Sequence, residues 1–302
     1  MTFPSAGGYN NLPNGNWSPE VFSQKVLRFF RTAAVAESIT NTDYAGEISD
    51  SGDTVNIIKE PVITVQDYVR GKDLEVQDLI DEALTLVVDK GKAFMFGVDD
   101  IEKKMSHIGW SELAQSSGAY ALTNHFDKDV LQYMFDNGTD VADLGGVGSP
   151  KTIGYGGGTE VTPLDLINLA AQALDENDVP QEGRWFLASP KFYTWLGKED
   201  GKLIDVSVTG DPESLIRSRK IATTRMIHGF MMFKSNNNPL GESDEVTIMA
   251  GHRSATATAT AITKSESCRR EKGFGDLYKS LLVYGRKVLR PEALVRGRVT
   301  FA

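Results

Sequence analysis

Glycines crowd the stretch TIGYGGGTEVTPLDLINL (152–169), directly before a helix start, at positions Gly154, Gly156, Gly157 and Gly158. A glycine-rich loop that opens onto a helix can cradle phosphate, because the backbone N–H groups there point at the anion. This loop has Thr159 and Glu160 where a P-loop needs Lys and Ser or Thr, and it lacks the third glycine of a dinucleotide fingerprint. We therefore favour a flexible joint, and keep a cytoplasmic nucleotide-binding enzyme that uses the loop 154–162 as an alternative.

The other side chains that could do chemistry lack suitable partners. Cys268 is the one cysteine, and its neighbours SESCRREKG offer no histidine base. The four histidines show no HxxxH or HExxH spacing, so we favour a structural role for each. Asp99, Asp100 and Glu102 could bind a divalent cation, but carboxylates in the first turn of a helix also favour its dipole. We predict no catalytic residue, no metal, no cofactor and no enzymatic activity.

The charge of the chain is acidic and unevenly spread. Its 302 residues carry a formal net charge of −9, which is unusual for a protein that coats phosphates. Residues 36–100 hold fifteen acidic against five basic side chains, whereas residues 264–302 hold ten basic against four acidic. These segments are either two solvated surfaces or surfaces through which copies of the chain meet, since opposite potentials steer an interface. We find no signal peptide and no apolar run of membrane length.

The first half of the chain contains elongated elements. Residues 1–17 are rich in Gly, Asn and Pro, and Ser18-Pro19-Glu20 then starts a helix with Val21, Phe22, Val26, Phe29, Phe30 and Ala33 near helical spacing. The segment 52–69 alternates like a strand. The segment 83–100 predicts either a hairpin that turns at 89–92 or a helix followed by a strand. Such strands, without an obvious second layer, need another chain to cover them.

A long helical region is predicted from Asp99 to about Phe135, and a helix of that length acts as a beam. Another helix starts at Thr162, which caps it, with a core stripe of Leu164, Ile167, Ala171 and Leu174. Strands are predicted at 184–188, 229–235, 245–251 and 254–262 and near the C-terminus, with a short helix after Ser189.

Several segments together resemble the major capsid proteins of tailed bacteriophages. They are GRWFLASPKFYTWL (183–196), IHGFMMFKSNNNPL (227–240), VTIMAGHRSA (246–255) and YGRKVLRPEALV (284–295), and the stretch 52–102 is similar to the extended loop that leads into the spine helix. The resemblance implies an α+β protein with the Hong Kong 97-type capsid fold. It implies an N-terminal arm (1–42), an extended β-hairpin loop (43–98), a spine helix and peripheral domain (99–160), an axial domain (161–265) and C-terminal strands that return to the peripheral domain (266–302).

The resemblance also implies function and partners. The expected function is a structural protein that self-assembles, as hexamers and pentamers, into the icosahedral shell around double-stranded DNA, which it contacts non-specifically. We expect a separate scaffolding protein, a portal protein at one vertex, no membrane, and a location in the virion capsid after synthesis in the host cytoplasm. An encapsulin-type shell, which packages cargo protein, is the near alternative. The candidate assembly-interface residues are Arg28, Arg31, Arg70, Lys72, Lys90 and Lys92, and the glycines at 154–158 are the candidate hinge.

Overall fold

The computed structural model describes residues 31–44, 54–61, 63–68, 70–71, 73, 76–77, 82–105, 110–146, 148–158, 160–198, 226–239, 245–271 and 273–302. Its helices are α1 (Ala36–Ile39), α2 (Asp100–Met105), α3 (Trp110–Asn137), α4 (Pro163–Glu176) and α5 (Pro190–Leu196). Its strands are β1 (Thr54–Lys59), β2 (Glu82–Val87), β3 (Lys90–Asp99), β4 (Thr139–Asp140), β5 (Lys151–Ile153), β6 (Arg184–Ala188), β7 (Met226–Ile227), β8 (Phe230–Lys234), β9 (Val246–His252), β10 (Thr256–Arg269), β11 (Gly275–Val288) and β12 (Leu294–Phe301).

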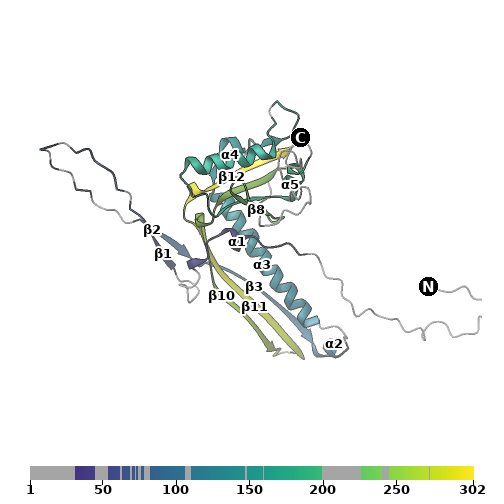
Figure 1. Cartoon of the computed structure of the whole chain (residues 1–302). Helices are drawn as coiled ribbons and strands as arrows, with labels where there is room; N and C mark the ends of the chain where they lie inside the picture. The colour runs from purple at the N-terminus through teal and green to yellow at the C-terminus, as the bar shows by residue number, and fades with distance from the viewer. Residues whose placement is uncertain are drawn as a thin grey trace, which may run out of the picture.

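The strands form three separate sheets in the part of the chain that the structure describes. The antiparallel pair β1–β2 makes a hairpin, and β10, β11 and β3 make a three-stranded antiparallel sheet. A seven-stranded mixed sheet has the order β4-β12-β9-β6-β8-β7, with β5 also paired to β12. The β1–β2 hairpin points away from the two larger sheets (Figure 1).

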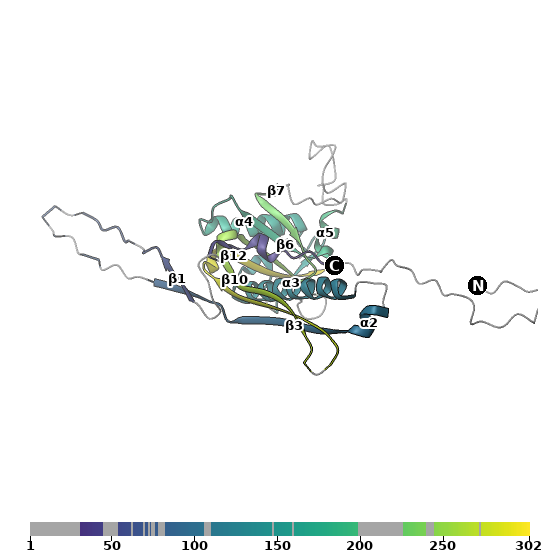
Figure 2. The ribbon, with the colours of Figure 1, turned by 90° about the horizontal axis from the view of Figure 1, so that it is seen from below.

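The spine of the molecule is α3, which lies along β3 (Figures 1 and 2). The prediction of one helix from Asp99 is wrong at its start, because Asp99 pairs with Gly275 as the last residue of β3. Helix α2 follows, and α3 begins at Trp110. The Phe94 ring of β3 packs over Gly118 so closely that a Cβ there would lie 2.5 Å from it. Gly118 therefore lets the helix lie closer to the sheet than a residue with a Cβ would allow.

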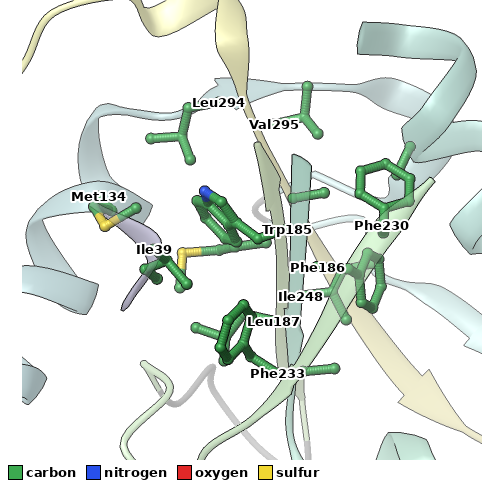
Figure 3. Packing of buried hydrophobic residues seen from close by; sticks show 14 of the residues in the cluster. Ile39, Met134, Trp185, Phe186, Leu187, Phe230, Phe233, Ile248, Leu294 and Val295 are labelled. Atoms are coloured by element: carbon green, nitrogen blue, oxygen red, sulfur yellow. The ribbon is translucent and has the colours of Figure 1, made fainter. Parts of the chain in front are cut away.

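The main core lies on both faces of the seven-stranded sheet. Along β6, successive side chains alternate between faces, as strand geometry requires. Trp185 and Leu187 lie on the side of Ile39 and Met134, whereas Phe186 lies on the other side with Phe230 (Figure 3). All the β6 residues are buried, so this central strand is covered by helices on both sides.

Helix α4 starts where the sequence predicts. The Thr162 Oγ1 accepts a hydrogen bond from the Asp165 backbone N–H at 3.2 Å, and Pro163 occupies the first turn. The predicted stripe is half right, because Ile167 and Leu174 are buried while Leu164 and Ala171 are half-buried. The buried face is rotated by about one residue toward Leu166, Ala170 and Ala173.

The hairpin predicted around 89–92 is wrong. Strands β2 and β3 follow each other in the chain but belong to different sheets, because β2 pairs with β1 and β3 pairs with β11. The alternative of a helix before the glycine is also wrong, since Glu82–Val87 is a strand. The projecting hairpin is β1–β2, whose strands are joined in the sequence by residues 60–81.

The C-terminal strands divide between two sheets. The predicted boundary at 265/266 falls inside β10, and β11 joins β10 to β3. Strand β12 pairs with β9, β4 and β5 in the seven-stranded sheet, and it also contacts the end of α3, where Arg296 Nη1 donates a hydrogen bond to the Phe135 carbonyl oxygen. The return of residues 266–302 to the peripheral domain therefore stays a prediction.

Candidate assembly surfaces

The far end of the β1–β2 hairpin carries large apolar side chains that nothing in the described chain covers. Ile63 is 69% exposed, Val65 is 92% exposed and Val76 is 94% exposed. Tyr68 and Ile58 are exposed as well. An exposed apolar patch on a thin projection indicates an interaction site, because leaving such side chains in water forfeits the free energy of their burial.

A side chain holds the two arms of this projection together. The Gln77 side-chain amide donates to the Thr64 carbonyl, and the Thr64 backbone N–H donates to Gln77 Oε1, both at 3.1 Å. This pair of hydrogen bonds imitates one rung of an antiparallel ladder at a position where neither residue belongs to a strand. It keeps the two arms close while leaving their apolar side chains exposed. The sequence gives no signal for this contact, because Gln77 resembles any solvated polar residue.

The root of the hairpin has a small hydrophobic core of its own. Leu86 and Val88 are buried against Ala257, Ala259 and Val283 of the three-stranded sheet. Strand β11 crosses the end of β2 so closely that a Cβ on Gly285 would lie 2.5 Å from the Val87 carbonyl oxygen. Gly285 therefore permits the contact that fixes where the hairpin leaves the body.

The four candidate interface cations that the structure describes do not gather at one place. Arg70 lies in a turn on the hairpin, next to Gly71, whose φ is +88°. Lys90 and Lys92 lie on β3, opposite Tyr284 and Leu282, and Lys90 forms an ion pair with Asp89 at 3.1 Å. Arg28 and Lys72 lie outside the described residues. The structure therefore moves Lys90 and Lys92 from the predicted loop to the three-stranded sheet.

Arg31 is bound to its own spine helix. Its Nη2 donates to Ser116 Oγ at 2.8 Å, and its guanidinium lies 5.2 Å from the centre of the Tyr120 ring. The next residue, Thr32, donates its backbone N–H to Tyr120 OH at 2.9 Å. Residues 31–35 are not helical, so the predicted helix does not reach Ala33.

A buried carboxylate holds the same segment farther along α3. Asp127 is fully buried, and its Oδ1 accepts hydrogen bonds from the backbone N–H groups of Val35 at 2.7 Å and Ala36 at 2.8 Å. Its Oδ2 accepts a hydrogen bond from Asn237 Nδ2 at 2.7 Å. Two backbone donors at the start of the short helix α1 are thereby satisfied by the spine helix. From the sequence, Asp127 looks like an ordinary solvated helix residue, and only the tertiary structure reveals its burial.

Many of the basic side chains in 264–302 are used inside the chain. Arg269, Lys279, Arg286, Arg296 and Arg298 each form an ion pair with an acidic side chain of the same chain. Arg286 and the Tyr284 hydroxyl both contact the Asp129 carboxylate of α3, and burial together with this hydrogen bond raises the pKa of Tyr284. The excess positive charge of residues 264–302 is therefore largely neutralised by acidic side chains of the same chain. This weakens the interpretation that the segment faces an acidic surface of a neighbouring copy.

One charged cluster closes the far end of the three-stranded sheet. Arg269 contacts Asp100 of α2 and lies 3.1 Å from Asp276 of β11, which Lys103 contacts at 2.9 Å. The hydrogen bonds from Lys103 and from Arg269 lower the pKa of the Asp276 carboxyl. Asp100 therefore lies in the first turn of α2, as predicted, and also joins α2 to the three-stranded sheet through its ion pair with Arg269.

The glycine loop is a closed turn within one body. Strand β5 before it pairs with β12, and Val161 after it forms a bridge with Ile153, so both flanks belong to the seven-stranded sheet. The Glu160 carboxylate accepts a hydrogen bond from the Gly156 N–H at 2.7 Å and occupies the space beside Gly154. The predicted joint between spine and axial domain is therefore misplaced, since the chain enters this sheet at β4, directly after α3. Whether the loop itself flexes stays a prediction.

The described residues offer little for chemistry. No group of three or more His, Cys, Asp or Glu side chains among them could hold a metal ion. None of the described helices is both long and apolar enough to cross a membrane. Glu160 fills the loop where a phosphate would have to approach, so the nucleotide-binding alternative is not favoured.

Comparison with solved structures identifies the fold. No protein-family model matches the sequence, and no curated protein matches it. A structure from Mycobacterium phage Che8 is 28% identical, with a TM-score of 0.79, over 95% of this chain and 97% of that chain. The capsid of cyanophage P-SCSP1u is 18% identical with a TM-score of 0.72, over 100% of this chain and 99% of that chain. The mature capsid of bacteriophage PhiM1 is 16% identical with a TM-score of 0.68, over 99% of each chain.

These three structures cover between 95% and 100% of this chain. The chain therefore has the Hong Kong 97-type fold of tailed-bacteriophage capsid proteins.

Proposed function

We propose that this chain is a structural major capsid protein, which assembles with copies of itself into the shell of a tailed phage. The observation that carries the proposal is the projecting hairpin, whose Ile63, Val65 and Val76 are exposed and have no cover in the described chain. A monomeric protein rarely maintains such a projection, because it gains nothing from the exposed apolar side chains. A second copy of the chain is the partner that every subunit of a shell has beside it.

The parts of the subunit acquire roles in this proposal. The hairpin is the extended loop that lies over a neighbouring subunit, and α3 with the three-stranded sheet forms the peripheral domain. The seven-stranded sheet with α4 and α5 forms the axial domain, which meets its copies around the centre of each hexamer or pentamer. The Arg286–Asp129 ion pair joins β11 to α3 within the peripheral domain, and the Arg296–Asp140 ion pair joins β12 to β4 within the axial domain.

The finer partners follow from the same proposal. A separate scaffolding protein directs assembly, a portal protein occupies one vertex, and packaged DNA is contacted non-specifically. The chain is made in the host cytoplasm and ends in the virion, and no catalytic residue is proposed. The net charge of −9 suits a coat whose DNA is driven in from outside, since such a coat need not neutralise phosphates.

The experiment that tests this proposal removes the projection and keeps its root. Lys59 and Glu82 are paired directly across the hairpin, so replacing residues 60–81 by Asn-Gly closes β1 and β2 with a two-residue turn. We expect a folded, soluble subunit that forms no closed shells in negative-stain microscopy. The unaltered chain, expressed in the same way, is the control and should form shells. Normal shells from the shortened chain would refute the role given to the hairpin.

A further inference from the structure

A groove lies between α3 and the part of the three-stranded sheet formed by Phe94 and residues 265–267 and 278–280. It encloses about 570 Å³, a volume within the range of about 300–1,000 Å³ that is typical of ligand pockets. Its apolar lining comes from Phe94, Ala119 and Tyr278, and its polar rim includes Glu112 and Ser116 of α3. Glu112 is exposed and forms no ion pair with any residue in the described ranges.

The described part of the N-terminal arm leads toward this groove. Its contacts with α3 move steadily toward the start of the helix as the chain is followed backward. Val35 and Ala36 bind Asp127, Thr32 binds Tyr120, and Arg31 binds Ser116. Ser116 is also part of the groove rim. The chain therefore reaches the edge of the groove at Arg31.

The distances fit an extended chain that runs along the helix. The step from Asp127 back to Ser116 covers about 16 Å of helix axis at about 1.5 Å per residue. The step from Val35 back to Arg31 covers about 13 Å at about 3.3 Å per residue, and the long arginine side chain spans the rest. A chain that continued in the same direction for two more residues would reach the level of Glu112 and Gln115, where the groove lies.

The side chains before Arg31 complement the apolar lining and the negative charge of this groove. Phe29 and Phe30 are large and apolar, and Arg28 is basic. The groove offers the Phe94 and Tyr278 rings, and Glu112 offers a negative charge. The second acidic residue of the rim, Glu266, already binds Lys279 at 2.9 Å, so Glu112 is the acceptor left for a cation.

We propose that residues 28–30 of the same chain occupy this groove, with Phe29 and Phe30 on its apolar lining and Arg28 beside Glu112. The occupied groove joins the arm, the spine helix and the sheet within one subunit. This inference goes beyond the proposed function, because it concerns contacts inside one subunit and does not require a shell.

Disulfide trapping in the full-length chain tests the proposal. The background variant Cys268→Ser removes the native thiol, and Phe29→Cys is combined with Gln115→Cys in the groove. A disulfide requires Cα atoms about 4.4–6.8 Å apart, so it reports close approach. The matched control combines Phe29→Cys with Ser117→Cys, which is exposed on α3 but does not line the groove. Soluble subunits are oxidised before assembly and separated on a non-reducing gel.

We expect an intrachain disulfide, seen as a band of faster mobility, in the groove pair and its loss in the control pair. A disulfide-linked dimer would overturn the proposal, because the groove would then hold the segment of another copy. Equal trapping in both pairs, or none in either, would also overturn it. Shell formation is scored separately by microscopy, so this proposal can fail while the proposed function stands.

A charge reversal tests the Arg28–Glu112 contact by rescue. Arg28→Glu should lower the trapped fraction of the groove pair, and adding Glu112→Arg should restore it. A trapped fraction that ignores both changes would contradict the placement of Arg28. If a cysteine variant fails to fold, hydrogen exchange replaces trapping, with Phe29→Glu/Phe30→Glu in the otherwise unaltered chain. Faster exchange at 112–119 and 263–267 supports the proposal, and unchanged exchange overturns it.

Discussion

In the seven-stranded sheet Trp185, Phe186 and Phe230 are buried, whereas on the hairpin Ile63, Val65 and Val76 are exposed. Burying one large apolar side chain is worth about 1.5–3 kcal/mol. Burial of the side chains in the sheet stabilises the subunit when it folds. The apolar side chains of the hairpin contribute this free energy only when another molecule covers them. The difference separates the residues that make the subunit from those that make an assembly, and it can be tested residue by residue on the free energy of unfolding.

The largest effect is expected at Phe186. Phe186→Ala removes a buried ring that packs against Phe192 and Phe230, and such a truncation costs about 3–5 kcal/mol. Urea denaturation of the soluble subunit, followed by circular dichroism, measures the loss. Val65→Ala on the hairpin is the matched control and should leave the midpoint where it is. Similar losses in the two variants would erase the distinction between the regions.

A smaller effect is expected at Asp127. Asp127→Ala leaves the N–H groups of Val35 and Ala36 without their acceptor and removes one of the two acceptors of the Asn237 amide, and an unsatisfied buried donor costs about 1–3 kcal/mol. The same denaturation experiment measures this loss. Asp136→Ala, on the exposed side of the same helix, controls for the change in helix charge. An Asp127→Ala subunit as stable as the Asp136→Ala subunit would contradict the role of this carboxylate.

The charged cluster at the end of the three-stranded sheet should contribute a pH dependence. The folded-state pKa of Asp276 is lowered by its hydrogen bonds with Lys103 and Arg269. The unfolded chain then binds the proton more readily, so the stabilisation is present above the ordinary value of 3.8 and is lost as the pH falls through the lower folded-state pKa. Asp276→Asn should flatten the acid side of a melting-temperature profile. A profile of unchanged slope would speak against the cluster.

The smallest effect on stability is expected at the hairpin, where Val65→Asp and Val76→Asp should change the free energy of unfolding by less than about 0.5 kcal/mol. Assembly should nevertheless fail, because a carboxylate at either position would have to be desolvated in the contact. Sedimentation of assembled material against subunit concentration measures this. Val65→Ile keeps the apolar surface and should assemble. Shells from the aspartate variants would show that these side chains stay in water.

Local signals in the sequence predicted much of the fold. Thr162 and Pro163 located the start of α4, because a cap and its first turn are neighbours in the chain. The Lys90-Gly91 turn signal misled, because the true partner of β3 is β11, which lies far along the sequence. Of the candidate site, the acidic projection was predicted, but the Gln77 contact, the burial of Asp127 and the crossing at Gly285 depend on tertiary neighbours that no local pattern encodes.

The position of β12 in the seven-stranded sheet has a consequence for how the chain is made. Strand β12 pairs with β4, β5 and β9. Strand β4 therefore cannot pair until β12, which is synthesised much later, has left the ribosome. The root of the hairpin likewise waits for β11 and Gly285. Contacts so distant in sequence slow folding, because a large loop must close before they form. A nascent chain that lacks its C-terminal strands therefore has an incomplete seven-stranded sheet and a hairpin whose root is not packed. The chain can join other copies only when its core is complete.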